Sequence, residues 1–169
     1  MAREATKDKC DAYKKQYPDV HSQFLFMTDG YNFRSMELNA VLGISQLKHL
    51  DSAIERRREI YDKFLKIIKK LGGFHTPQQE GNSSFCLPFI CEDKDQKQKL
   101  EKYLQNNGVE TRPLCSGNLL KQPFLRNYLS DIDEDSTVEF LHNNGFFIGN
   151  NHLITDQEIQ ELEKILNEF

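Results

Sequence analysis

Two stretches of the sequence carry polar side chains in arrangements that suit the binding of anions. In the first, residues 30–34 read Gly-Tyr-Asn-Phe-Arg, so that Asn32 and Arg34 precede an apolar helical pattern. A helix start exposes unpaired backbone N–H groups that favour a negative charge, and an arginine beside it can hold a phosphate with two hydrogen bonds. The alternative interpretation is structural, with Tyr31 and Phe33 forming a hydrophobic staple. The residues alone leave both interpretations open.

The second stretch, residues 110–123, lies next to the end of an expected strand. Its polar and small residues are Arg112, Ser116, Gly117, Asn118 and Gln122. Loops at the ends of strands often carry binding residues, because the rigid element positions them. A surface loop without a binding role is the alternative, and composition does not decide between the two.

Other patterns of catalytic or metal-binding residues are missing from the sequence. The five histidines do not pair at helical spacing or with cysteines, so we expect no metal site. The four cysteines form no C-x-x-C pair and are expected to be reduced thiols. Neither a G-x-S-x-G motif nor a glycine-rich phosphate loop is present. The acidic residues 131–135 lack the pattern of a calcium loop and are interpreted as a surface turn. We therefore expect no catalytic residue in this chain.

Composition excludes several classes of protein. A length of 169 residues suits one domain with a real core, and the net charge of -4 provides no basic field for nucleic acid. The Glu-Arg-Arg-Arg-Glu run at residues 55–59 leaves a nucleic-acid-binding helix as an alternative, but its flanking acids favour a solvated face. The sequence has no apolar run of membrane-spanning length and no signal-peptide pattern at its start. We expect a cytoplasmic protein without a nucleic-acid or membrane partner.

The element that follows the first polar stretch is an amphipathic helix. Apolar residues recur at steps of three and four from Met36 to Leu71, which predicts one long helix. Ser35 is its expected N-cap, and the glycines at residues 72–73 its expected stop. The first part, residues 36–44, is apolar on nearly all sides, which indicates that the same chain, a further domain or another subunit covers it.

The remaining pattern alternates between helices and short strands. Strands are predicted at residues 83–92, 109–114 and 146–150. Helices are predicted at residues 5–17, 93–108, 136–145 and 155–169, with a short helix inside residues 115–127. Pro88 is expected to place its strand at an edge or a bulge, and Thr155 with Glu158 predicts a capping box. The predicted class is α+β, with a long N-terminal helix and a small, mostly antiparallel sheet covered by helices.

The sequence resembles a known family over essentially its whole length. Residues 30–61 are similar to the signature of the PLP-dependent sugar aminotransferases of the DegT/DnrJ/EryC1/StrS group, including Glu37, Ala40 and the Gly-x-x-Gln-Leu of residues 43–47. Residues 109–126 and 141–159 resemble the branch that includes the NDP-4-keto-6-deoxyhexose 3-dehydratases.

The resemblance implies a fold, a cofactor and roles for single residues. The implied fold is the small C-terminal domain of a type I PLP-transferase. The resemblance implies that Asn32 binds the PLP phosphate of a partner subunit and that Arg34 faces the nucleotide-sugar substrate. It also implies a substrate-side position for the polar loop residues Arg112, Ser116, Gly117 and Asn118. The large domain with the Schiff-base lysine, a histidine in the dehydratases, is expected to be absent, so this chain should be inactive alone and hold no PLP covalently.

The expected organisation follows from the same resemblance. Residues 1–34 would be a connecting segment with the active-site loop, and residues 35–169 the small domain. The expected partner is a second copy in a dimer or an N-terminal PLP-binding half, and the expected pathway is the synthesis of deoxy- or amino-sugars for cell-surface polysaccharides. The alternative is a free-standing α+β assembly or binding module derived from that fold. Whether the reaction is an aminotransfer or a dehydration, and on which sugar, stays open.

Overall fold

The computed structural model describes residues 7–27, 36–78, 80–115, 117–128 and 135–169. The chain forms two compact units. The first unit combines residues 1–32 with residues 113–143, and the sheet unit combines residues 33–112 with residues 144–169. The sequence placed a division at residue 34 but gave no sign that residues 113–143 group with the N-terminal segment.

A four-stranded sheet in the order β1-β2-β4-β3 forms the centre of the sheet unit. The strands are β1 (Phe74–His75), β2 (Cys86–Cys91), β3 (Thr111–Pro113) and β4 (Gly145–Gly149). Both β1 and β4 run antiparallel to β2, which confirms the predicted kind of sheet. The sequence did not predict β1, because two residues are too few to show a periodic pattern.

The predicted edge position of Pro88 is wrong, because β2 lies between β1 and β4. The proline is tolerated for a local reason. In an antiparallel strand the nitrogen and carbonyl of one residue point to the same neighbour. The carbonyl of Pro88 accepts a hydrogen bond from Thr76 Oγ1 at 2.9 Å, on the side of β1. Since β1 ends at His75, the missing N–H of the proline costs no ladder bond there.

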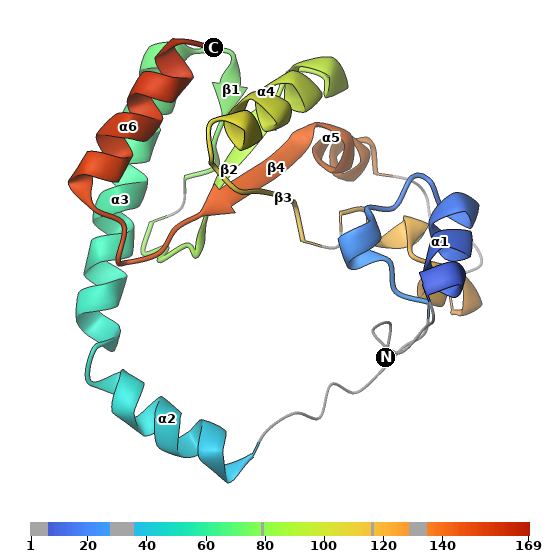
Figure 1. Cartoon of the computed structure of the whole chain (residues 1–169), viewed down its shortest axis with the longest axis horizontal. Coiled ribbons are helices and arrows are strands. Elements are labelled where there is room, and N and C mark those ends of the chain that lie inside the picture. The colour runs from blue at the N-terminus through green and yellow to red at the C-terminus, as the bar shows by residue number, and fades with distance from the viewer. Residues whose placement is uncertain (1–6, 28–35, 79, 116, 129–134) are drawn as a thin grey trace. The chain divides into compact units, whose positions relative to one another are not determined.

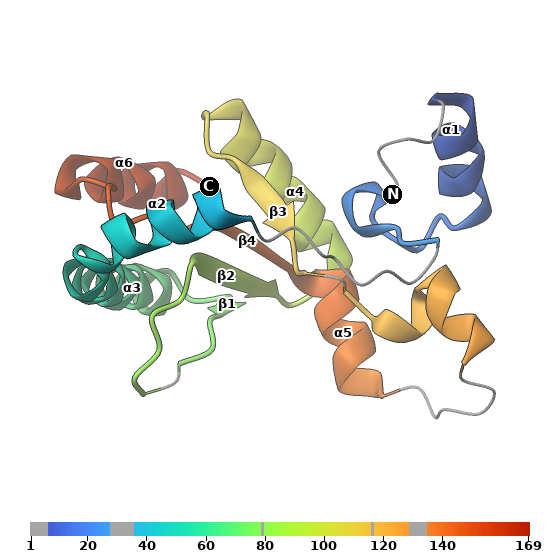
Figure 2. The same cartoon turned by 90° about the horizontal axis from the view of Figure 1, so that it is seen from below.

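Three helices cover one face of this sheet. They are α3 (Leu50–Leu71), α4 (Lys94–Asn106) and α6 (Asp156–Asn167), and α3 and α6 run side by side (Figure 1 and Figure 2). Alternate residues of β2 and β4 point into the core below them, where Phe89 stacks on Phe146 with ring centroids 4.9 Å apart. Phe64 of α3 meets Phe89 edge-on at 5.1 Å. This packing confirms the predicted α+β class with covering helices.

The long helix predicted from residue 36 to residue 71 is two helices. The first, α2 (Glu37–Leu47), ends before His49, whose backbone leaves the helical region, and α3 begins at Leu50. Apolar spacing continues across the break without a glycine or proline, so the sequence did not reveal it. The N-cap of α2 is Met36, and the predicted cap Ser35 lies outside the described residues. The predicted stop is confirmed, because Gly72 caps α3 with a φ of 70°.

The apolar side chains of α2 are uncovered by the described part of the chain. None of its residues is buried. The side chains exposed by more than half are those of Met36, Leu38, Val41, Leu42, Ile44 and Leu47. A contiguous apolar surface of this kind on a protein usually marks an interaction site. A cover for this helix therefore stays a prediction.

The first unit is built from short elements. It contains α1 (Lys7–Gln16), the 3-10 turns η2 (Ser22–Phe24), η3 (Leu119–Lys121) and η4 (Pro123–Asn127), and most of α5 (Ser136–Asn144). The helices predicted near the N-terminus, within residues 115–127 and at residue 136 are confirmed. Among the described residues of the whole chain, no helix is long and apolar enough to cross a membrane.

Candidate functional site

The residues predicted to bind ligands fall into two groups. Asn32, Arg34 and Ser116 lie outside the described residues, so their roles stay predictions. Arg112, Gly117 and Asn118 are described, and so is the chain that leads toward residues 28–35. The structure therefore shows the surroundings of the two polar stretches rather than their centres.

Arg112 is an exposed arginine on β3. Its Nε and one terminal nitrogen donate to the same carboxylate oxygen of Glu110, at 3.0 and 2.7 Å. Both side chains are more than half exposed to solvent, and pairs of this kind contribute only about 0–1 kcal/mol to stability. The guanidinium can thus exchange this partner for another anion at little cost, and the substrate-side role of Arg112 stays a prediction.

Gly117 leaves space for the ring of His142, which lies on α5 and forms hydrogen bonds with the polar loop and with the N-terminal segment. The φ of Gly117 is +53°, and a Cβ there would lie 2.2 Å from Nδ1 of His142, so only glycine fits. The same Nδ1 accepts a hydrogen bond from the backbone N–H of Asn118 at 3.1 Å. Nε2 therefore carries the proton of the neutral ring and donates to the carbonyl of Asp19 at 2.7 Å. His142 of α5 thereby joins the polar loop to the N-terminal segment.

Asn118 is buried, and its side chain organises the same loop. Its Oδ1 accepts from the backbone N–H of Leu120 at 3.0 Å, and its Nδ2 donates to Glu139 at 3.0 Å. Glu139 also accepts from Lys121 Nζ at 2.7 Å and from Asn143. These hydrogen bonds, of which the one from Lys121 has the largest effect, lower the pKa of the Glu139 carboxyl group to about 2. Asn118 thus positions the loop, while contact with a substrate stays a prediction.

The sequence did not identify Glu139 and His142 as members of this network. Both lie on α5, more than twenty residues from the loop that they bind. A charged residue and a histidine on a short polar helix carry no local signal for such contacts. Only the grouping of residues 113–143 into one unit brings them to Asn118.

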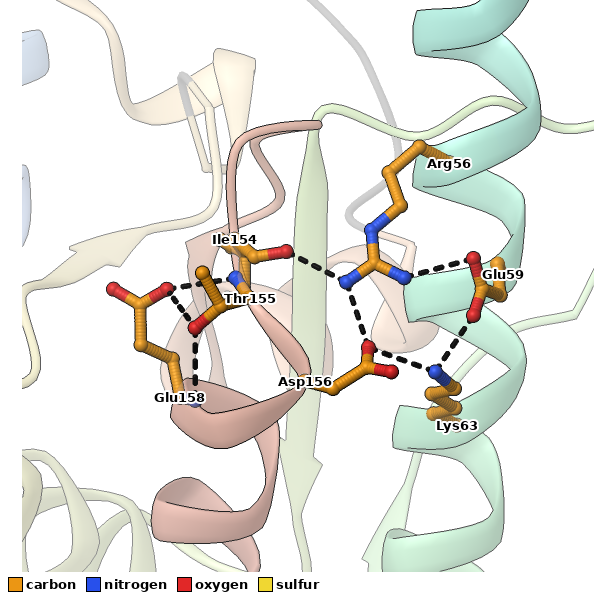
Figure 3. Close-up of polar contacts among 7 residues, drawn as sticks. All are labelled: Arg56, Glu59, Lys63, Ile154, Thr155, Asp156 and Glu158. Atoms are coloured by element: carbon orange, nitrogen blue, oxygen red, sulfur yellow. Dashed lines mark hydrogen bonds and ion pairs between the residues drawn. The ribbon is translucent and has the colours of Figure 1, made fainter.

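The arginine run at residues 55–59 serves the sheet unit rather than a ligand. Arg56 donates to Glu59 at 2.8 Å, and through its other terminal nitrogen to Asp156 at 2.8 Å and the carbonyl of Ile154 at 2.7 Å (Figure 3). Lys63 completes the network with Glu59 and Asp156 at 2.6 and 2.9 Å (Figure 3). Hydrogen bonds from Lys63 and Arg56 lower the pKa of Asp156. The network fastens the start of α6 to α3.

The next two arginines bind the loop before β2. Arg57 donates to the hydroxyl of Ser83 at 3.1 Å, and Arg58 donates to the carbonyl of Gly81 at 2.7 Å. All three guanidiniums of the run are therefore engaged within the chain. This removes the main support for the nucleic-acid-binding alternative, and it differs from the purely solvated face that the sequence favoured.

A cavity of about 450 Å³ in the sheet unit is lined by none of the predicted site residues that the structure describes, although Glu110, which binds Arg112, lines it. Its floor is apolar, and its rim carries Glu110, Glu158 and Glu161 with no lysine or arginine among the described lining residues. Three carboxylates would repel a nucleotide diphosphate or a cofactor phosphate. Burial lowers the pKa of Lys97, but this lysine does not line the cavity. Among the described residues, no group of metal-binding side chains could hold an ion.

Comparison with known proteins gives a family and a set of relatives. The DegT/DnrJ/EryC1/StrS aminotransferase family matches residues 2–166. The chain is 34% identical over 158 residues to a GDP-4-keto-6-deoxy-D-mannose 3-dehydratase of Escherichia coli O55:H7, covering 90% of this chain and 40% of that protein. It is 30% identical over 108 residues to a GDP-perosamine synthase of Escherichia coli O157:H7, covering 63% of this chain and 30% of that protein.

Solved structures agree with these relatives. The E. coli GDP-4-keto-6-deoxy-D-mannose-3-dehydratase with bound hydrated PLP matches with a TM-score of 0.70 and 31% identity, over 86% of this chain and 39% of that chain. The Helicobacter pylori aminotransferase PseC, involved in the biosynthesis of pseudaminic acid, matches with a TM-score of 0.69 at 16% identity, which shows a shared fold. This chain thus spans about 40% of the length of the dehydratases that it matches.

Proposed function

Because the chain belongs to the DegT/DnrJ/EryC1/StrS aminotransferase family, we propose that it provides the substrate side of the active site in a PLP-dependent enzyme acting on a nucleotide sugar. It corresponds in this proposal to the C-terminal part of its dehydratase relatives. The complete reaction belongs to an assembly with an N-terminal PLP-holding part, on the same or another polypeptide. A second copy of the chain and a cytoplasmic location are parts of the same proposal.

The observation that carries the proposal is the composition of the first unit. Residues 7–27, which lead toward the first polar stretch, belong to it, and so do Gly117 and Asn118 of the second stretch. His142 and its hydrogen bonds to Asp19 and Asn118 link the two segments. This link between the polar loop and the chain that leads toward residues 28–35 supports the proposal.

Each residue in this proposal binds or orients, and none of them breaks a bond. Asn32 donates its side-chain amide to the cofactor phosphate, and Arg34 faces the diphosphate of the nucleotide sugar. The polar loop, with Arg112 at its start and Gly117 in its turn, lies against the substrate. PLP, held by the other part, supplies an electron sink for the chemistry. The relatives favour a 3-dehydration over an aminotransfer as that chemistry.

A complementation experiment tests the proposal. The chain is combined with the N-terminal PLP-holding part of the E. coli O55:H7 dehydratase, and the activity and PLP affinity of the assembly are measured. A hydrogen bond to a charged phosphate contributes about 1.5–3 kcal/mol, so Asn32→Ala should weaken PLP binding about ten- to a hundredfold. Arg34→Ala should raise the KM for the nucleotide sugar, because it removes a cation that faces the diphosphate.

Two comparisons keep this test specific. Asn107→Ala alters an exposed amide at the end of α4 and should leave both PLP affinity and KM unchanged. The chain alone should show no absorbance of lysine-bound PLP. If Asn32→Ala and Arg34→Ala both behave like Asn107→Ala, residues 30–34 return to the staple interpretation, and the alternative of a free-standing binding module gains support.

A further inference from the structure

The side-chain amide of Gln122 forms hydrogen bonds with the backbone of residues 24–26, as a neighbouring β-strand would. Its side chain is completely buried in the first unit. Nε2 donates to the carbonyl of Phe24 at 2.7 Å, and Oε1 accepts from the backbone N–H of Phe26 at 3.1 Å. One amide thus satisfies a donor and an acceptor on two residues of the same segment. A side-chain amide can both donate and accept from one planar group in this way.

The backbone on both sides of this contact is fixed. The backbone N–H of Gln122 donates to the carbonyl of Leu119 at 2.9 Å, and the carbonyl of Gln122 accepts from the backbone N–H of Leu125 at 3.1 Å. Gln122 therefore lies at the junction of η3 and η4. On the other side, the N–H of Phe24 donates to His21 at 2.9 Å in the turn η2. The glutamine therefore joins two turns that are each closed by backbone hydrogen bonds.

The segment that Gln122 holds leads directly into residues 28–35. Phe26 lies two residues before that stretch, and the contact of His142 with Asp19 ties the same segment seven residues earlier. The peptide at residues 24–26 is thus held just before the stretch 28–35 in the sequence. Asn32 and Arg34 follow within eight residues of Phe26.

We propose that Gln122 is a positioning residue for the segment that carries Asn32 and Arg34. It acts through the backbone of Phe24 and Phe26 and touches neither cofactor nor substrate. This inference rests on the function proposed above for Asn32 and Arg34. It explains why a glutamine is buried in a small polar unit, where an unsatisfied amide would be costly.

The first test measures the segment itself in the full chain. Gln122→Met keeps the size of the side chain and removes both hydrogen bonds. We expect hydrogen exchange at the Phe26 amide to accelerate about tenfold or more, because two bonds in a buried site are lost. Chymotrypsin cleavage after Tyr31 and Phe33 should accelerate with it. Exchange in α4 should stay unchanged, which shows that the sheet unit is still folded.

Two further variants separate positioning from loss of stability. Gln122→Glu keeps the acceptor for Phe26 but cannot donate to Phe24 when ionised, and it should accelerate cleavage at Tyr31 as Gln122→Met does. Asn143→Ala also removes hydrogen bonds within the first unit, to Glu139, but does not touch residues 24–26. It should leave cleavage at Tyr31 close to that of the wild type. Equal cleavage in Gln122→Met and Asn143→Ala would overturn the proposal.

The second test links the segment to ligand binding in the complemented enzyme. Gln122→Met should both weaken PLP binding and raise the KM for the nucleotide sugar, each about three- to tenfold. These effects should have the same direction as those of Asn32→Ala and Arg34→Ala but be smaller. Faster cleavage at Tyr31 with unchanged PLP affinity and KM would confirm the positioning and refute the function proposed for residues 30–34. Unchanged cleavage and unchanged exchange at Phe26 would refute the positioning, whatever the activity.

Discussion

Glu139 shows how single residues define the polar loop. Its carboxylate accepts from Lys121, Asn118 and Asn143, so one charge organises both the loop and the helix α5. These donors lower the pKa of Glu139 from an ordinary 4.5 to about 2. The side chain is 31% exposed, so solvent screens part of this stabilisation. The charge of this one residue therefore contributes to the stability of the first unit in a way that depends on pH.

The pH dependence of Glu139 gives a prediction with a definite sign. A carboxyl group whose pKa is lower in the folded state stabilises that state above its unfolded pKa, and the contribution is lost as pH falls through the folded pKa. Glu139→Gln should therefore reduce the free energy of local opening by about 1–2 kcal/mol at pH 7. The difference from the wild type should shrink between pH 4.5 and pH 2.

Hydrogen exchange at residues 118–122 measures this free energy of opening. The Asn143→Ala variant is the control, because it removes a neutral partner and leaves the ionisable group in place. A difference between wild type and Glu139→Gln that stays constant from pH 7 to pH 2 would contradict the assignment of the low pKa to this carboxylate.

The residues that the sequence could identify share a local signal. Gly117 and Asn118 stand in a polar loop beside a strand end, and their type and place were enough to select them. Glu139 and His142 were not identified, because their roles come from contacts with residues more than twenty positions away. The same holds for Gln122, which was noticed as a polar residue but whose partners lie 96 and 98 positions away.

At the scale of elements, the start of α6 is stabilised by a capping box and by ion pairs with α3. The hydroxyl of Thr155 accepts from the backbone N–H of Glu158, and the carboxylate of Glu158 accepts from the backbone N–H of Thr155, so the predicted capping box is confirmed. Asp156, the next residue, binds Arg56 and Lys63 of α3. The capping box satisfies the free N–H groups of the helix, and the ion pairs fix the helix against its neighbour.

Removing the cap should weaken α6 without changing its position. Thr155→Ala should lower the free energy of unfolding of the sheet unit by about 1 kcal/mol, the usual cost of losing an N-cap. Urea unfolding followed by circular dichroism measures the change. Thr137→Ala, an exposed threonine near the start of α5, is the control and should cost less than half as much. Equal effects of the two substitutions would show that the capping box adds nothing in this protein.

Elements were predictable wherever local pattern and tertiary packing agree. The helices α4 and α6 and the strands β2 and β4 follow from spacing, caps and β-branched or aromatic runs. The break between α2 and α3 was missed because the apolar spacing runs through it. The interior position of Pro88 was missed because it depends on the length of the neighbouring strand, which no local pattern of β2 contains.

At the scale of the whole molecule, the chain leaves its sheet unit and later returns to it. Residues 113–143 depart after β3 and come back at β4, and in between they join the N-terminal segment. The resemblance to the family predicts one small domain over residues 35–169, whereas the contacts of the structure group residues 113–143 with the N-terminal segment. Resemblance to the family predicts a binding function for the polar stretches, whereas the structure shows the contacts of Gly117, Asn118 and residues 24–26.

The exposed surface of α2 leads to a prediction about assembly. Leu38, Val41 and Ile44 are each more than 60% exposed, and apolar surface removed from water stabilises a complex by about 25 cal/mol per Å². We therefore expect the chain to self-associate at tens of micromolar through this helix. Replacing Val41 and Ile44 together by glutamate should shift the assembly toward monomers, because charges on both residues would be buried in the interface.

Light scattering across a concentration series, with the exchange of core amides as a check on folding, measures this assembly. Val138→Glu is the matched control, since it places a charge on an exposed apolar residue of α5, outside α2. It should leave the mass at each concentration as in the wild type. If the wild type stays monomeric throughout and binds no dye that reports apolar surface, α2 does not drive self-association. If Val138→Glu dissociates the assembly and the double variant on α2 does not, the contact lies on the first unit instead.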